Sequence, residues 1–150
     1  MNVWYSLSDI PGNEASVVTI GNFDGMHNGH KKVISTCVER AHKLGVDAVA
    51  ITFDPHPIQV HKPEVGLQLI SPLRDRLDAM AAAGLDATLV AHYDASVYSL
   101  EADEFVYEYL VERCGAREVV VGEDFRFGRG NAGTIDTLRE LGSRYGFNVI

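Results

Sequence analysis

Two histidines, His27 and His30, lie three residues apart with Gly29 between them, shortly after an apolar run at residues 17–20. On a helix this spacing places both imidazoles on one face, and Gly29 leaves the space between them open to a ligand. The free amides and the positive dipole end of a helix N-terminus favour a phosphate, and two lysines follow directly. The pattern indicates a loop that binds a polyphosphate.

The residues around the histidine pair predict a strand, a tight turn and a helix. Residues 17–20 are β-branched or apolar without polar alternation, as in a strand buried on both faces. Gly21 and Gly25 supply the backbone freedom that a sharp turn needs. An apolar stripe at helical spacing then predicts a helix over residues 28–43.

The histidine pair allows three interpretations. Fixed donors aimed at a phosphorus centre would stabilise the extra negative charge of its transition state. Alone, a pair with this spacing is more typical of surface or capping histidines, but Gly29, the strand and Asp24 favour the phosphate interpretation. A zinc site would need further ligands, and the sequence has no matching second cluster. Asp24 could orient a histidine or sugar hydroxyls, or form an Asx-turn, and Phe23 could simply be a core residue.

The ten-residue segment, Gly21-x-Phe23-Asp24-Gly25-x-His27-x-Gly29-His30, carries a family resemblance. It resembles the His-x-Gly-His signature of the nucleotidylyltransferase superfamily. The longer form is similar to the N-terminal adenylyltransferase module of prokaryotic bifunctional riboflavin kinase/FAD synthetases. The resemblance implies that His27 and His30 are catalytic and donate to the phosphates of ATP. It further implies that the nucleotide is bound by Gly21, Phe23, Asp24, His27, Gly29 and His30.

A second stretch, Phe53-Asp54-Pro55-His56-Pro57, follows the predicted strand at residues 47–53. It resembles the Pro-His-Pro loop of the same family, which implies that Phe53, Pro55 and His56 bind the flavin mononucleotide, FMN. An aromatic ring and an imidazole in a rigid loop suit stacking on an isoalloxazine plane. Without the resemblance the stretch is a stiff turn. Its prolines argue against a helix there, so we expect irregular structure as far as Ile70.

A third stretch, residues 121–134, resembles the family signature Gly-x-Asp/Asn-Phe-x-Phe-Gly. The resemblance implies that Asp124, at the tip of a strand, is catalytic and holds Mg²⁺, and that Phe125 and Phe127 bind flavin. We expect only one of the two rings to touch the ligand, while Arg126 and Arg129 could meet phosphate. The alternative is a glycine-rich turn with a packed phenylalanine and solvated arginines.

Strands and helices alternate along the whole chain. The predicted strands are residues 17–20, 47–53, 87–91, 118–121 and 147–150, and the predicted helices between them are residues 28–43, 71–83, 102–114 and 135–145. Residues 3–5 could add another strand, and Ser71 and Thr134 could cap the helices that follow them. This alternation predicts an α/β fold: a Rossmann-like, doubly wound parallel sheet with helices on both faces. Ligands of such sheets bind at the carboxyl ends of the strands, where all three stretches would meet.

Composition restricts the function further. The formal net charge of −8 argues against non-specific binding of nucleic acid. No apolar run approaches the roughly 20 residues that span a bilayer, and the chain starts without a signal-peptide pattern, so we expect a cytoplasmic protein without membrane contact. The two cysteines, Cys37 and Cys114, lie in helical patterns and are expected to be buried free thiols.

Together the three stretches imply an FMN adenylyltransferase domain over residues 1–150, with ATP and FMN as substrates and Mg²⁺ as cofactor. The family module carries a later Ser-Ser-Thr-x-x-Arg motif and is followed by a riboflavin kinase domain, and neither occurs before Ile150. We therefore expect a C-terminally incomplete module of a longer bifunctional protein. Two alternatives stay open: another transferase of the superfamily, such as a cytidylyltransferase, against which the stretch 53–57 argues, and a non-catalytic flavin- or nucleotide-binding module.

Overall fold

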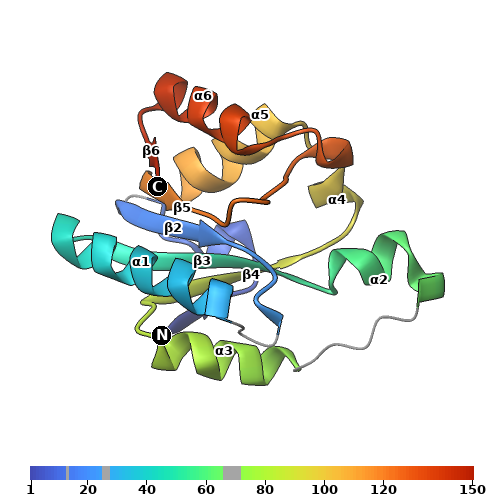
Figure 1. Cartoon of the computed structure of the whole chain (residues 1–150), viewed down its shortest axis with the longest axis horizontal. Coiled ribbons are helices and arrows are strands. Elements are labelled where there is room, and N and C mark those ends of the chain that lie inside the picture. The colour runs from blue at the N-terminus through green and yellow to red at the C-terminus, as the bar shows by residue number, and fades with distance from the viewer. Residues whose placement is uncertain (13, 25–27, 66–71) are drawn as a thin grey trace.

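The structure is a computed structural model of the 150-residue chain, and it describes residues 1–12, 14–24, 28–65 and 72–150 (Figure 1). Six parallel strands form one sheet in the order β1-β4-β3-β2-β5-β6. Their bounds are Asn2–Trp4 for β1, Ser16–Ile20 for β2, Asp47–Asp54 for β3, Ala87–His92 for β4, Ala116–Val120 for β5 and Asn148–Val149 for β6. The predicted Rossmann-like α/β fold is confirmed, and the additional N-terminal strand lies at one edge.

Helices connect these strands. The α-helices are α1 (Asn28–Leu44), α2 (Pro57–His61), α3 (Leu73–Ala82), α4 (Ala95–Tyr98), α5 (Ala102–Phe105) and α6 (Ile135–Tyr145). Single 3-10 turns are η1 (Leu7–Asp9), η3 (Pro63–Val65) and η5 (Arg129–Asn131), and α5 continues into the π-helix η4 (Val106–Arg113).

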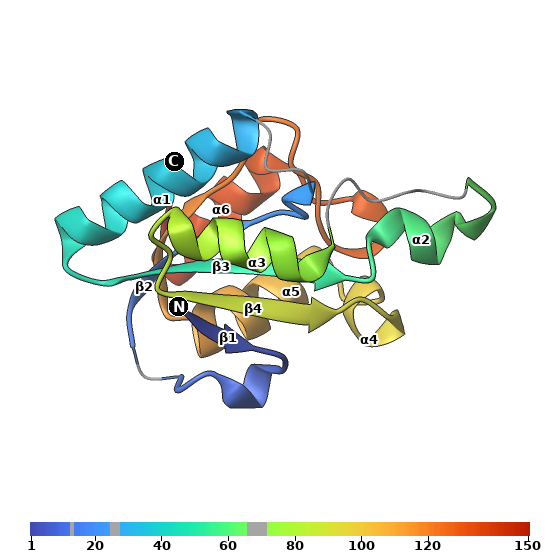
Figure 2. The same cartoon turned by 90° about the horizontal axis from the view of Figure 1, so that it is seen from below.

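The helices cover both faces of the sheet, as Figures 1 and 2 show. Helices α1 and α3 lie on one face, whereas α5, η4 and α6 lie on the other. Alternation along β2 sends Val17 into the first layer, against Ile34 and Cys37 of α1, and Val18 into the second. Every residue of β2 is buried, as predicted for a strand covered on both faces.

The direction in which the chain builds the sheet changes between β2 and β5. From β2 the chain adds β3 and then β4 on one side, and it returns to place β5 and β6 on the other side of β2. The carboxyl ends of β2 and β5 therefore flank a topological switch point, where doubly wound folds bind ligands. The first and third signature loops follow these two strands, and the second follows the neighbouring β3.

The expectation of irregular structure from Pro57 onward is wrong. Pro57 is the first residue of α2, and the short 3-10 turn η3 follows. Proline is compatible with the first helical turn because its missing N–H would have no helical partner there, and its fixed φ suits a helix. The next helix begins at Leu73 with Pro72 as N-cap. The predicted cap, Ser71, lies outside the described residues, as does the stretch 66–70.

The helix predicted over residues 102–114 is present, but most of it is π-helical rather than α-helical. Phe105 and Tyr109, paired at four-residue spacing, stack with ring centroids 4.7 Å apart. The cap predicted for α6 is confirmed, since the Thr134 hydroxyl accepts from the Thr137 N–H at 3.3 Å. Gly146 ends α6 with a left-handed φ of 92°.

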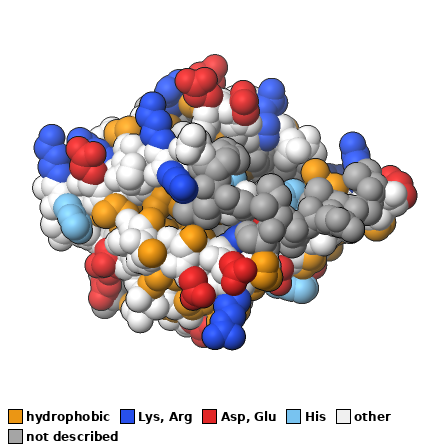
Figure 3. Space-filling model, turned by 60° about the horizontal axis from the view of Figure 1, so that its bottom comes forward, with side chains coloured by type: hydrophobic (Ala, Val, Ile, Leu, Met, Phe, Trp, Pro, Cys, Tyr) orange, Lys and Arg blue, Asp and Glu red, His pale blue; other side chains and the backbone are white. Residues whose placement is uncertain are grey.

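Both cysteines are free and buried, as predicted. Burial raises the pKa of each thiol, Cys37 and Cys114, to about 12, so neither is a reactive thiolate near neutral pH. No helix among the described residues is long and apolar enough to cross a membrane. The described part of the face in Figure 3 carries Lys and Arg side chains mixed with Asp and Glu, so its charges are of both signs.

Candidate active site

The first loop is built around Phe23. Its side chain is 2% exposed and belongs to the core layer beneath α1, as one of the two interpretations of the sequence proposed. A Cβ at Gly21 would meet the Phe23 ring at 3.0 Å, so close packing favours glycine there. Phe23 itself has a φ of 54°, a left-handed conformation that is costly for an aromatic residue and is held by the surrounding packing.

Phe23 also orients His30. The two rings meet edge to face, with centroids 5.4 Å apart and an interplanar angle of 79°. His30 lies in the first turn of α1, half-buried, while its neighbour Gly29 is exposed. The histidine is thus held by a core residue at the start of a helix whose N-terminus faces the carboxyl edge of the sheet (Figure 1). His27 and Gly25, predicted members of this loop, lie outside the described residues.

A residue that the sequence analysis did not identify holds the backbone of this loop. Arg76 of α3 is 2% exposed, and its Nη1 donates to the Asn22 carbonyl oxygen at 2.6 Å and to the Thr52 hydroxyl at 3.4 Å. The Thr52 hydroxyl donates to the same carbonyl at 3.2 Å. The first loop is therefore fixed to both β3 and α3.

In the second loop, His56 has a structural role. It is the N-cap of α2: its Nδ1 accepts from the Ile58 N–H at 3.1 Å, and the Gln59 side chain accepts from the His56 N–H at 3.0 Å. Burial lowers the pKa of His56; the nearby Asp24 carboxylate opposes this effect and the Arg76 guanidinium adds to it. Asp24, His56 and Arg76 are thus electrostatic neighbours, which brings the first two loops and α3 to one place.

Next to the second loop lies an aromatic cluster that the sequence analysis also missed. Tyr93, directly after β4, meets Phe53 edge to face at 5.7 Å and lies 5.7 Å from the ring of Tyr98. His61 packs on both tyrosines, and its Nε2 lies 2.7 Å from the Tyr93 hydroxyl. His61 is exposed, but it is not an isolated surface residue. The available signal was a tyrosine two residues after the predicted strand at residues 87–91.

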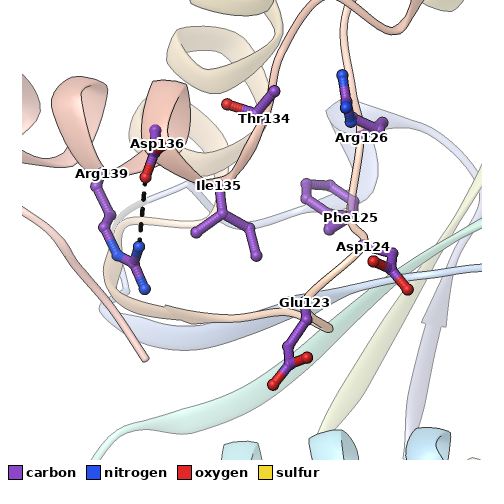
Figure 4. Close-up of a pocket in the computed structure, with 8 residues that line it drawn as sticks. All are labelled: Glu123, Asp124, Phe125, Arg126, Thr134, Ile135, Asp136 and Arg139. Carbon is purple, nitrogen blue, oxygen red and sulfur yellow. Dashed lines mark ion pairs between the residues drawn. The ribbon is translucent and has the colours of Figure 1, made fainter.

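The third loop, residues 122–133, borders an open pocket of about 590 Å³ together with the first turns of α6 (Figure 4). Glu123, Asp124 and Arg126 are exposed on it. In Figure 4 the Phe125 ring lies between Ile135 and Asp124, and an ion pair joins Arg139 to Asp136 at 3.5 Å. The pocket therefore combines one aromatic surface with charges of both signs.

The two phenylalanines of this loop have different surroundings. Phe127 is 6% exposed, lies against Phe105, and exchanges backbone hydrogen bonds with Gly133 at 2.8 and 3.1 Å. Phe125 stacks on Phe127 with centroids 5.5 Å apart but keeps part of its surface exposed. Only Phe125 has substantial ring surface available to a ligand in this conformation.

Asp124 could hold a magnesium ion only together with a substrate. Among the described residues, no group of three or more His, Cys, Asp or Glu side chains could hold a metal ion. Mg²⁺ is, however, commonly bound by one or two carboxylates together with substrate phosphates and water. An exposed carboxylate in the loop that follows β5, beside the switch point, fits that mode of binding.

Comparison with known proteins gives one consistent family. The family model described as FAD synthetase matches residues 9–150. The bifunctional riboflavin kinase/FMN adenylyltransferase of Escherichia coli K12 is 32% identical over 97% of this chain and 46% of its own length. That of Buchnera aphidicola from Acyrthosiphon pisum is 34% identical over 92% of this chain and 44% of its own. A Geobacillus thermodenitrificans protein provisionally given the same name is 42% identical over 87% and 68%, respectively.

The solved structures agree on the fold. A Streptococcus pneumoniae protein described as a macrolide-efflux protein superposes with a TM-score of 0.84 at 24% identity, covering 99% of this chain and 56% of that one. A universal stress protein from Archaeoglobus fulgidus gives a TM-score of 0.52 at 13% identity, covering 91% of this chain and 96% of its own. This chain spans 44 to 68% of the curated relatives described above. Because the family model covers nearly all of it, the chain belongs to the FAD synthetase family.

Proposed function

We propose that this chain is an FMN adenylyltransferase module, which transfers AMP from ATP to FMN and gives FAD and pyrophosphate. The observation that carries the proposal is the first loop. Its predicted phosphate ligand His30 is held by the buried Phe23 at the start of α1, beside the switch point of the sheet. Family membership and the names of the relatives support the same reaction.

In this reaction a phosphate oxygen of FMN attacks the α-phosphorus of ATP, and the bond from that phosphorus to the pyrophosphate oxygen breaks. No protein nucleophile is required. The chain contributes position and charge, which are most of the catalysis in phosphoryl-type transfers. We propose that His27 and His30 donate to the triphosphate as negative charge grows, and that the nucleotide lies along Gly21, Phe23, Asp24 and Gly29. Phe23 acts there through His30 and the loop backbone rather than by direct contact.

The second and third loops are proposed to hold the flavin. Phe53 is half-buried and is continuous with Tyr93, so an isoalloxazine ring could lie on this aromatic surface beside Pro55 and His56. Of the third loop, Phe125 is the proposed contact, while Phe127 supports it from the core. Asp124 is proposed to hold Mg²⁺, which would neutralise phosphate charge.

The composition of the whole protein is a further part of the proposal. The relatives continue well beyond the part that this chain matches, and their names include riboflavin kinase. We propose that a riboflavin kinase domain and the later phosphate-binding segment accompany this module in the whole protein, and that the module works in the cytoplasm.

The test is incubation of a longer form of the protein, continuing past residue 150, with FMN, ATP and Mg²⁺, followed by chromatographic detection of FAD. Formation of FAD with release of pyrophosphate is expected. Replacing ATP by CTP should abolish the product, since a cytidylyltransferase would show the opposite preference. Quenching of flavin fluorescence without pyrophosphate release would identify a non-catalytic binding module. The 150-residue chain is assayed in parallel, so that the two activities measure what residues beyond 150 contribute.

A further inference from the structure

Arg76 is a buried cation without a carboxylate partner among the described residues. It is 2% exposed, and it forms none of the ion pairs found in the described part of the chain. Its Nη1 uses both of its donors, on the Asn22 carbonyl and the Thr52 hydroxyl. Its Nε and Nη2 are buried and have no hydrogen-bond partner among the described residues.

A second guanidinium in the same molecule shows which kind of partner the Nε and Nη2 atoms of an arginine can bind. Arg40 of α1 presents its Nε and Nη2 to the two carboxylate oxygens of Glu118, each at 2.6 Å. This fork of parallel donors matches the spacing of oxygens in a carboxylate or a phosphate. Arg76 has the same two atoms available and no such partner within the described structure.

Leaving a buried charged group unpaired is costly, whereas pairing it with an anion recovers much of that cost. The Arg76 guanidinium donates to the Asn22 carbonyl and helps to lower the pKa of His56. An anion bound at its Nε and Nη2 would therefore lie next to the predicted phosphate site.

We propose that Arg76 is a further phosphate-binding residue of this site: its Nη1 holds the first loop, and its Nε and Nη2 donate hydrogen bonds to phosphate oxygens of the substrate. The proposal rests on the proposed function for the identity of the substrate. Both substrates carry phosphate, so the shared chemistry is a phosphate group of ATP or of FMN. The contact to Asn22, within the first signature, favours the triphosphate.

The test compares Arg76→Gln and Arg76→Lys with the control Arg74→Gln in the 150-residue chain. Arg74 lies on the same helix, is exposed, and loses the same charge in its variant. Calorimetric titrations with inorganic pyrophosphate, ATP and FMN give the affinities, and circular dichroism with thermal unfolding reports the fold. The glutamine amide is too short to replace Nη1 at the Asn22 carbonyl, so Arg76→Lys, which keeps the charge and a longer reach but not the fork, separates loss of the fork from loss of the loop contact.

We expect Arg76→Gln to bind pyrophosphate and ATP at least about tenfold more weakly, as for loss of a charged hydrogen-bond pair, and Arg74→Gln to match the wild type. A loss confined to FMN would also support a phosphate contact and would assign it to that substrate. If Arg76→Gln fails to fold, Arg76→Lys decides, because it keeps the charge and loses the fork; several-fold weaker binding supports the proposal.

Unchanged affinity for all three ligands in a folded Arg76 variant overturns the inference, and so does a wild-type chain that binds none of them. Failure of the proposed function is recognised separately, by the absence of FAD from the longer form. A chain that makes no FAD but loses pyrophosphate affinity in Arg76→Gln would keep the anion site and lose the assigned reaction.

Discussion

The loops on the two sides of the switch point are built in opposite ways. After β2, the first loop packs Phe23 into the core, and Arg76 holds the loop backbone. After β5, the third loop leaves Asp124 and Arg126 exposed beside an open pocket of about 590 Å³. The described part of the first loop, residues 21–24, is thus packed in place, whereas the third loop is open to a ligand. Because little of this part must become ordered when a ligand binds, its binding energy can instead stabilise the transition state at the reacting phosphate.

The largest expected effect tests the packed side. His30→Ala in the longer, active form should lower turnover by on the order of a hundredfold, because it removes a donor aimed at developing charge. Steady-state kinetics measure this, and circular dichroism should show a fold close to that of the wild type. Turnover equal to wild type would mean that the histidine, although held by Phe23, is only packed there.

A pair of glycine variants compares the loops directly. Gly21→Ala places a methyl group 3.0 Å from the Phe23 ring and should cost about 1–3 kcal/mol of unfolding free energy, as for overpacking. Gly122→Ala opens onto space without a heavy atom within 4 Å, and its cost should stay within about 0.5 kcal/mol. Urea denaturation of both variants measures the difference. Equal costs would show that the first loop is no more tightly built than the third.

A charge variant tests the open side. Asp124→Ala in the longer form should raise the Mg²⁺ concentration needed for half-maximal activity, on the order of tenfold, because a carboxylate ligand is lost. Asp124→Asn should be milder, since its amide oxygen can still coordinate the ion. Identical Mg²⁺ activation curves for wild type and Asp124→Ala would make this carboxylate structural.

The smallest expected effect concerns pH and the second loop. Burial lowers the pKa of His56 below its ordinary value of about 6.5, so the folded chain binds this proton less readily than the unfolded chain. The stability contributed by His56 is therefore complete above about pH 6.5 and declines as the pH falls toward the lowered pKa of the folded state. The loss should not exceed about 1 kcal/mol, the usual value of an N-cap.

Thermal unfolding between neutral and mildly acidic pH measures this decline. The control is His56→Asn, which keeps a capping oxygen without a titrating ring, and it should lack the His56 part of the pH dependence. Wild type and His56→Asn with the same pH profile would exclude the cap as its source.

Local patterns predicted much of this molecule. The strand at residues 17–20, the helix after it and the Thr134 cap follow from side-chain types within a few residues of each other, and the structure confirms all three. The parallel sheet follows as well, because alternating strands and helices leave few other ways to bury both faces of each strand. Once the strands are parallel, their carboxyl ends share one edge, so a common place for the three loops was also foreseeable.

Tertiary contacts decided the rest. Arg76 lies 54 residues from Asn22 along the chain, and no local pattern distinguishes it from the exposed Arg74. Phe127 packs against Phe105 of α5, and this contact between distant segments leaves Phe125 as the ring that a ligand can reach. Pro57 could begin a helix because His56 and Gln59 cap it, whereas proline alone suggested a turn. Short-range order is encoded by neighbours in the sequence, but which side chain meets a ligand depends on packing between distant segments.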